Sequence, residues 1–131
     1  MTTLIVRIVD DDCALAEGLA YLLEGEGWQV NVYDSAQRFL SEDLPSVPGC
    51  LVLDVRMPGM TGLELQRVMR ERHYNLPIIF LTGHGDIEMA VATMKLGAVE
   101  FLQKSGNNTQ LLNAVARAVS RSLSGWVDME A

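Results

Sequence analysis

Residues 50–64 read CLVLDVRMPGMTGLE, and they carry the clearest signals of the fold. A continuous apolar run ends in Asp54, and a turn with Pro58 and Gly59 follows it. Thr61 and Glu64 then have the spacing of a capping box, which marks a helix N-terminus. A strand that is apolar on both faces and leads directly into a helix is typical of a parallel sheet covered by helices.

Similar short runs recur along the whole chain, roughly every 20 to 25 residues, which is the spacing of repeated strand–helix units. The runs at 4–9, 51–55 and 78–81 are almost wholly apolar, which is typical of interior strands. Those at 28–33 and 99–102 mix apolar and polar residues, which is typical of edge strands. We therefore predict an α/β fold: a flavodoxin-like, doubly wound five-stranded parallel sheet in the order 2-1-3-4-5, with five helices.

The helix signals lie between these runs. Asp12 is interpreted as a helix N-cap, Asp34-Ser35 opens the second helix, and Thr61 opens the third. A fourth helix is expected over 86–96 with Gly97 as its stop, and a fifth carries apolar residues up to Leu123. Residues 1–124 are thus predicted to form one domain. Residues 125–131 are expected to be a tail, or the start of a linker to a possible output domain outside this chain.

Charge and composition exclude several classes. The net charge of -7 argues against direct contact of this domain with nucleic acid. No apolar run approaches the roughly 20 residues that span a bilayer, so no membrane association is expected. The two cysteines, Cys13 and Cys50, have no metal-binding spacing and are interpreted as thiols of a reducing cytoplasm.

Polar residues follow the predicted strands at one edge of the sheet. Asp10 and Asp11 follow the first strand, and Asp54 ends the third. Thr82 ends the fourth strand, and Lys104 follows the fifth. The carboxyl ends of parallel strands meet at one edge, where ligands bind beside the strand at which the chain reverses direction. Clustered carboxylates repel one another, so they either take up a proton or bind a hard cation such as Mg²⁺.

Four motifs in order resemble those of the receiver domains of two-component response regulators. They are IVDDD, LVLDVRMPGMTGLEL, IIFLTGHGD and GAVEFLQK, and the resemblance covers about residues 4–123. Asp54 follows Asp11 by 43 residues, Thr82 follows Asp54 by 28, and Lys104 follows Thr82 by 22, as is usual in that family. The GHGD sequence after Thr82 most resembles the subfamily whose parent proteins carry a helix-turn-helix transcription output domain.

The resemblance implies a phosphoryl-transfer site. Asp54 would accept a phosphoryl group from a histidine kinase, and Lys104 and Thr82 would bind that group. Mg²⁺ would be bound by Asp11, Asp54 and the backbone carbonyl of Arg56, with Asp10 acting through water.

The resemblance also implies a switch and a partner surface. Thr82 and Phe101 would change together on phosphorylation, and Arg56 and His84 would lie at the rim of the site. The face of the fourth helix, fifth strand and fifth helix would change, with a possible homodimer as the result. Transcription would be controlled through a separate DNA-binding domain, and the domain would be no enzyme beyond assisting its own phosphorylation and dephosphorylation.

One position departs from the family. Proline usually follows the conserved lysine, often after a cis bond, whereas Ser105 follows Lys104 here. A cis bond before a non-proline residue costs about 2.5–4 kcal/mol, so a trans bond is expected. We then expect a rerouted loop, with Lys104 farther from Asp54 than usual.

Two rival functions are weighed against this interpretation. A Mg²⁺-dependent phosphohydrolase of the haloacid dehalogenase type would need a second Asp two residues after the nucleophile, where this chain has Arg56. A receiver-like domain that only binds partners would not need the intact acidic, hydroxyl and lysine set.

Overall fold

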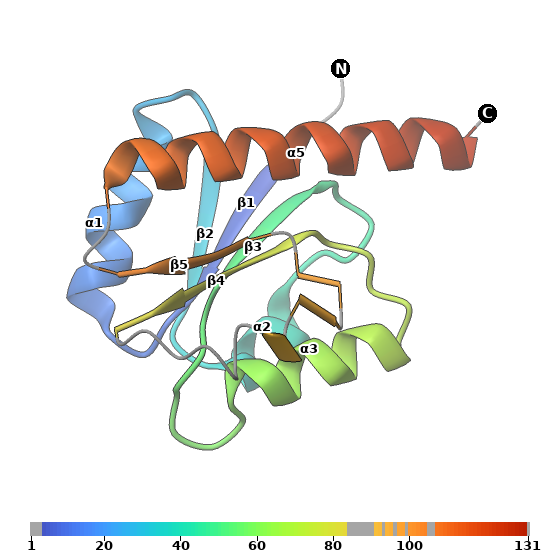
Figure 1. Cartoon of the computed structure of the whole chain (residues 1–131). Helices are drawn as coiled ribbons and strands as arrows, with labels where there is room; N and C mark the ends of the chain where they lie inside the picture. Colours follow the sequence, from blue (N-terminus) through green and yellow to red (C-terminus); the bar gives the residue numbers. More distant parts are fainter. Residues whose placement is uncertain are drawn as a thin grey trace.

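In the computed structural model, five parallel strands form one sheet in the order β2-β1-β3-β4-β5 (Figure 1). The structure describes residues 4–83, 91–92, 94–95, 97–98, 100–104 and 107–130. The strands are β1 (Ile5–Val9), β2 (Gln29–Tyr33), β3 (Gly49–Asp54), β4 (Ile78–Thr82) and β5 (Glu100–Gln103). The predicted order is confirmed, and β2 and β5 are the edge strands, as their mixed composition indicated.

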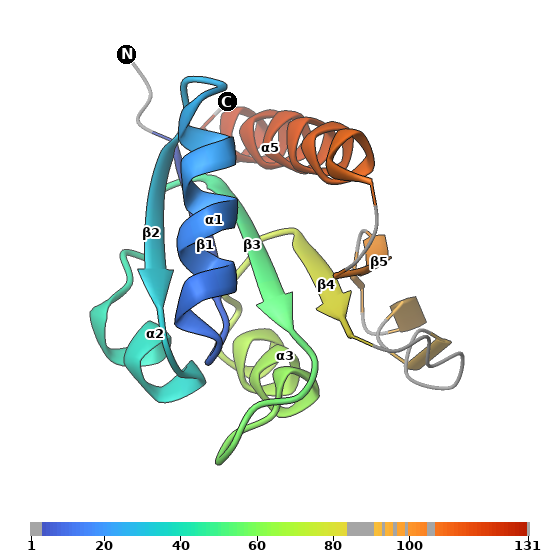
Figure 2. The ribbon, with the colours of Figure 1, turned by 90° about the vertical axis from the view of Figure 1, so that its left-hand side faces the viewer.

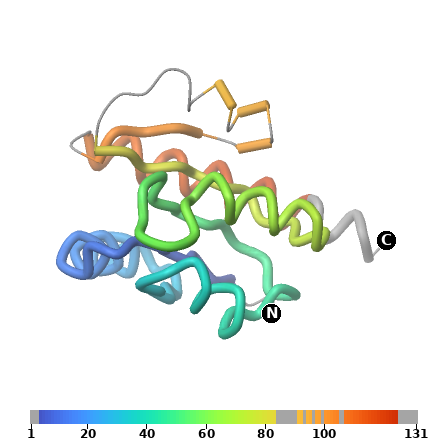
Figure 3. Tube along the Cα trace, turned by 90° about the horizontal axis from the view of Figure 1, so that it is seen from below, coloured from blue at the N-terminus to red at the C-terminus, as the bar shows by residue number. Residues whose placement is uncertain are grey.

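Helices cover both faces of the sheet. The described helices are α1 (Cys13–Glu24), α2 (Ala36–Glu42), α3 (Gly62–Glu71) and α5 (Asn108–Glu130). One apolar cluster joins α1 and α5 to the sheet, and a second joins α2 and α3 to its other face. Figures 2 and 3 show the arrangement of these helices around the sheet. Residues 91–92 and 94–95 are helical, but the rest of the helix predicted over 86–96 lies outside the described residues.

The helix starts follow the predicted capping chemistry. Asp12 accepts a hydrogen bond from the amide of Leu15 at 3.1 Å and caps α1. Thr61 and Glu64 form the complete capping box of α3. These bonds satisfy amides that have no partner within the first turn of a helix, and they confirm both assignments.

The edge strand β2 differs from the alternation in its sequence. Trp28, Val30 and Val32 alternate with Gln29, Asn31 and Tyr33 in the sequence, but Val32 is 42% exposed and Tyr33 only 6% exposed. The phenol of Tyr33 donates to Asp43 at 2.8 Å, so a buried polar partner draws this side chain inward.

The C-terminal helix also differs from the sequence pattern. The apolar repeat fades after Leu123, but α5 continues as helix to Glu130. Apolar periodicity reports packing against a core, and a helical backbone can continue beyond the last packed turn. The tail expected over 125–131 is therefore helical up to Glu130.

A buried arginine organises the amino-terminal edge of the sheet. Arg7, in the middle of β1, is fully buried, and its Nε lies 3.1 Å from both carboxylate oxygens of Asp43. Its other nitrogens donate to backbone carbonyls, among them those of Leu44 at 2.8 Å and Val47 at 2.7 Å. A buried charge is tolerated when it is paired and hydrogen-bonded in this way. The network shapes the loop that joins α2 to β3.

The two cysteines occupy contrasting environments. Both thiols are free; Cys13 is exposed at the start of α1, whereas Cys50 is buried in β3. Burial raises the pKa of Cys50 to about 12, although the charge of Arg7 lowers it slightly.

Candidate functional site

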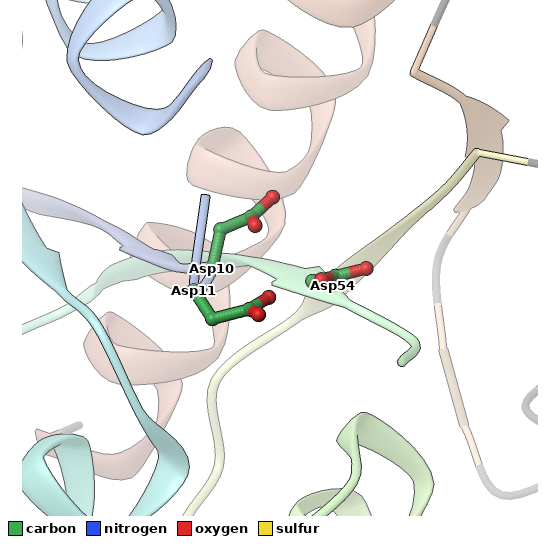
Figure 4. Close-up of side chains that lie close together, drawn as sticks. All are labelled: Asp10, Asp11 and Asp54. Atoms are coloured by element: carbon green, nitrogen blue, oxygen red, sulfur yellow. The ribbon is translucent and has the colours of Figure 1, made fainter. Parts of the chain in front are cut away.

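Acidic side chains meet at the carboxyl edge of the sheet. Asp10 and Asp11 follow β1, and Asp54 is the last residue of β3, which lies beside β1 (Figure 4). The chain passes from β1 outward to β2 and then returns to β3, so the three residues lie where the direction of winding reverses. The topology thus joins residues that are more than 40 positions apart.

The three carboxylates have the geometry of a cation site. One oxygen from each lies within 4.8 Å of the others. Asp10 and Asp54 are buried, whereas Asp11 is exposed, so one side of the cluster opens to solvent. Hard oxygen ligands beside water are what Mg²⁺ prefers. The residues therefore fit the metal that the sequence predicted.

Lys104 forms ion pairs with two of the three carboxylates. Its ammonium nitrogen lies 3.0 Å from Oδ2 of Asp10 and 3.2 Å from Oδ1 of Asp54. The expectation that Lys104 lies farther from Asp54 is therefore wrong. The amide of Lys104 donates to the carbonyl of Thr82 at 2.7 Å, and this bond places the lysine beside the end of β4. Ser105 and its peptide bond lie outside the described residues.

Opposing effects set the pKa values of Asp54 and Lys104. Burial and the charge of Asp10 raise the pKa of Asp54 to about 6, although Lys104 and the amide of Arg56 act in the other direction. Partial burial lowers the pKa of Lys104, but Asp10 and Asp54 outweigh it, so the pKa is raised overall. One lysine thus partly compensates two buried carboxylates, and the cluster keeps an excess of negative charge.

The loop after β3 is closely packed around Asp54. The amide of Arg56 donates to Oδ1 of Asp54 at 3.3 Å, and the amide of Gly62 donates to the carbonyl of Val55 at 3.0 Å. A Cβ atom on Gly62 would lie 2.3 Å from the backbone oxygen of Asp54 and 3.1 Å from the ring of Phe80. Only a residue without a side chain allows α3 to begin this close to the site.

The predicted switch residues lie on neighbouring strands. Thr82 is buried at the end of β4, one strand away from Asp54. Phe101 in β5 is half-buried and stacks on Phe80, with ring centroids 6.2 Å apart. Arg56, two residues after Asp54, is exposed, and His84 lies outside the described residues.

Sequence reasoning missed two contributors to the site. The sequence pattern assigned no role at the site to Gly62, which lies within the capping-box segment, or to Tyr33, which lies in a predicted edge strand. The carbonyl of Tyr33 accepts the amide of Asp10 at 3.2 Å. One signal in the sequence could have pointed to the buried network that holds Tyr33. Arg7 is a charged residue within an apolar strand, and such a residue needs a buried partner.

Comparison with known proteins gives the family. The model of the response regulator receiver domain matches residues 6–116, which is most of the chain. The chain belongs to the response regulator receiver domain family. The resemblance inferred from the four motifs is thereby confirmed.

Curated relatives of this receiver include a transcriptional regulatory protein and a response regulator protein. It is 44% identical over 117 residues to the transcriptional regulatory protein FixJ of Azorhizobium caulinodans, a match that covers 89% of this chain and 56% of FixJ. It is 45% identical over 115 residues to the response regulator protein TodT of Pseudomonas putida, covering 88% of this chain and 51% of TodT. The chain spans about half the length of the curated relatives it matches.

Solved structures agree with this assignment. The response regulator StyR superposes with a TM-score of 0.93 at 42% identity, over 98% of this receiver and 65% of that chain. The structure named FixJ-N gives a TM-score of 0.83, also at 42% identity, over 92% of this receiver and 96% of that chain. Within the described part of this receiver, no helix has the length and apolar character needed to cross a membrane.

Proposed function

We propose that this receiver accepts a phosphoryl group from a histidine kinase on Asp54. The observation that carries the proposal is the position of the Asp54 carboxylate, within 4.8 Å of oxygens of Asp10 and Asp11 and 3.2 Å from the Lys104 ammonium. A carboxylate nucleophile, a cation site and a fixed positive charge are the parts that phosphoryl transfer requires.

In the proposed reaction, one oxygen of Asp54 attacks phosphorus while the bond to the kinase imidazole nitrogen breaks. The electron pair of the broken bond stays on the imidazole nitrogen, and Asp54 reacts as its ionised carboxylate, so it neither gains nor loses a proton in the step. Lys104 already contacts Asp54, so its charge is in place to pair with the transferred group. Thr82, two strands from β1 at the same edge, supplies a hydroxyl for a further bond to that group.

Asp11, Asp54 and the carbonyl of Arg56 are proposed to ligate Mg²⁺, with Asp10 bound through water. The ion would supply positive charge that neutralises phosphoryl oxygens. The negative excess of the cluster supports this assignment, since a divalent cation compensates what Lys104 leaves over.

The wider role follows from the relatives. FixJ and TodT extend well beyond the matched receiver, so we propose that an output domain for transcription follows residue 131 in the parent protein and that residues 125–131 begin its linker. Phosphorylation is proposed to act through Thr82 and Phe101 on the surface of the fourth helix, β5 and α5, promoting a homodimer in the cytoplasm. The domain itself would not be an enzyme, since Arg56 stands where a phosphohydrolase needs its acid.

Labelling with a small phosphodonor and Mg²⁺ tests the proposal. Intact-mass analysis should show one added phosphoryl group, and Asp54→Asn should remove it. Asp12→Asn is the matched control, because it removes a neighbouring charge while asparagine can still cap α1. Labelling that survives in Asp54→Asn, or that is lost in Asp12→Asn alone, contradicts the assignment.

The proposed dimer has a separate test. Light scattering of the wild type with and without a beryllium fluoride phosphoryl mimic should show a doubling of mass. An unchanged mass, together with unchanged amide shifts on β5 and α5, would remove the dimer from the proposal.

A further inference from the structure

The edge strand β2 has one buried residue, at its carboxyl end. Within β2, Tyr33 alone is buried; the other four residues are half-buried or exposed. The ring of Tyr33 packs edge-on against Phe39 of α2, with centroids 5.6 Å apart. The backbone of β2 pairs with β1 on one side, and Tyr33 adds a buried side-chain contact at the carboxyl end of the strand.

The two polar ends of Tyr33 bind two different parts of the molecule. Its phenol donates to Oδ1 of Asp43 at 2.8 Å, and Asp43 is in turn paired with the fully buried Arg7. Its carbonyl accepts the amide of Asp10 at 3.2 Å. Tyr33 therefore connects the buried ion pair with the backbone of the acidic site.

The connection reaches a residue with little freedom of its own. Asp10 is 1% exposed, its Oδ1 accepts the amide of Asp12 at 2.9 Å, and its Oδ2 faces Lys104 at 3.0 Å. The orientation of this carboxylate depends on where the backbone leaves β1, and the bond to the Tyr33 carbonyl is formed at that point.

We infer that Tyr33 is a positioning residue for Asp10, acting through its backbone carbonyl and anchored by the bond of its phenol to Asp43. The consequence for Mg²⁺ rests on the proposed function; the consequence for the Asp10 amide does not. Groups that orient metal ligands from outside the coordination shell typically change metal affinity by about 10- to 100-fold when removed.

Tyr74 offers a matched control. Its phenol also binds Asp43, and its ring stacks on Phe39, with centroids 5.4 Å apart. Tyr74 follows α3, and its carbonyl accepts the amide of Leu76 and makes no described bond to Asp10. Tyr33→Phe and Tyr74→Phe therefore remove the same kind of bond from the same carboxylate, but only the first is connected to the site.

The experiment compares wild type, Tyr33→Phe and Tyr74→Phe in three measurements. These are urea unfolding, hydrogen exchange of the Asp10 amide, and titration with Mg²⁺ alone followed by amide shifts. Both variants should be less stable than wild type. Only Tyr33→Phe should exchange the Asp10 amide faster and bind Mg²⁺ about tenfold more weakly, at the lower end of the range for such groups.

The outcomes separate the inference from the proposed function. Equal Asp10 exchange in the two variants, or equal Mg²⁺ affinity where the wild type binds Mg²⁺, overturns the positioning role. If the wild type binds no Mg²⁺, the proposed metal site fails and the exchange measurement still decides about Tyr33. Should Tyr33→Phe not fold, exchange in the wild type decides: the Asp10 amide is expected to open together with the β2 amides, and independent opening overturns the inference.

Discussion

Gly62 shows how one missing side chain shapes the site. A methyl group there would lie 2.3 Å from the backbone oxygen of Asp54, so either α3 or the end of β3 must shift. We expect Gly62→Ala to cost about 1–3 kcal/mol of unfolding free energy, the usual range for overpacking. It should also slow phosphorylation, because the displaced atom belongs to the phosphoacceptor residue. Urea unfolding and a labelling time course measure the two effects.

Gly18 provides the control for that substitution. It is exposed within α1, and a Cβ atom there would meet nothing within 4 Å. Gly18→Ala should therefore stabilise the protein by about 0.5–1 kcal/mol, because alanine loses less backbone freedom in a helix. If the two alanine variants had similar stability and labelling rates, close packing at Gly62 would not be the cause.

At the scale of single residues, the sequence predicted the charged centre of the site well. Asp10, Asp11 and Asp54 each end or follow a strand, and strand ends can be located from apolar runs. The approach of Lys104 to Asp54 was predicted wrongly, because the backbone bond from Lys104 to Thr82 decides it and leaves no mark in the sequence. The role of Gly62 was missed because its close approach to the backbone of Asp54 also leaves no mark in the sequence.

A serine hydroxyl adds a hydrogen bond to the apolar packing between the C-terminal helix and the central sheet. Ser122 of α5 accepts a hydrogen bond from the amide of Gly49, the first residue of β3, at 3.0 Å. Removing this bond in Ser122→Ala should cost about 1 kcal/mol relative to a serine without such a partner. Ser120 lies exposed on the same helix and is that reference.

The comparison of the two serines cancels the change in helix propensity. Both substitutions replace serine by alanine in α5, so each gains the same small helix-forming advantage. Denaturant unfolding should therefore place Ser122→Ala below Ser120→Ala in stability. Equal midpoints for the two variants would mean that the bond to Gly49 contributes nothing measurable.

Features of single helices and strands could be predicted where the sequence carries a local signal for them. Capping residues and the contrast between interior and edge strands are local features, so the starts of α1 and α3 and the edges β2 and β5 were predicted from sequence. The burial of Tyr33 was not, because its partner Asp43 is ten residues away and has no recognisable pattern. The extension of α5 to Glu130 was not, because apolar periodicity ends before the helix does.

At the scale of the whole molecule, the buried phenol of Tyr33 predicts the alkaline limit of stability. Burial, and then its bond to Asp43, raise the pKa of Tyr33 to about 12, whereas tyrosine in an unfolded chain titrates near pH 10. A raised pKa in the folded state stabilises the fold below the unfolded value, and the contribution is lost as the pH rises from about 10 to 12. Stability should therefore fall across this range.

Urea midpoints measured at increasing alkaline pH test this limit. The wild type should lose stability more steeply than Tyr33→Phe, which has no phenol to ionise. Parallel curves for the two proteins would assign the alkaline loss to other groups.

The architecture as a whole was the most predictable level. Five apolar runs at regular spacing, two of them half-polar, admit few right-handed arrangements, and the order 2-1-3-4-5 is the one that the structure has. The apolar pattern could not predict the buried polar network. Arg7 donates to backbone carbonyls of the loop between α2 and β3, and that loop has no regular structure that a pattern could indicate.

Because one thiol is exposed and the other is buried, the rate of alkylation of the buried thiol can report unfolding of the protein. An alkylating reagent should add once to the native chain, at exposed Cys13, because the buried Cys50 thiol is shielded and has its pKa raised to about 12. A second adduct can form only when β3 opens. The growth of the doubly labelled mass with time should therefore report opening of the central sheet, without any dye or engineered probe. Two adducts formed at once on the native protein would contradict this.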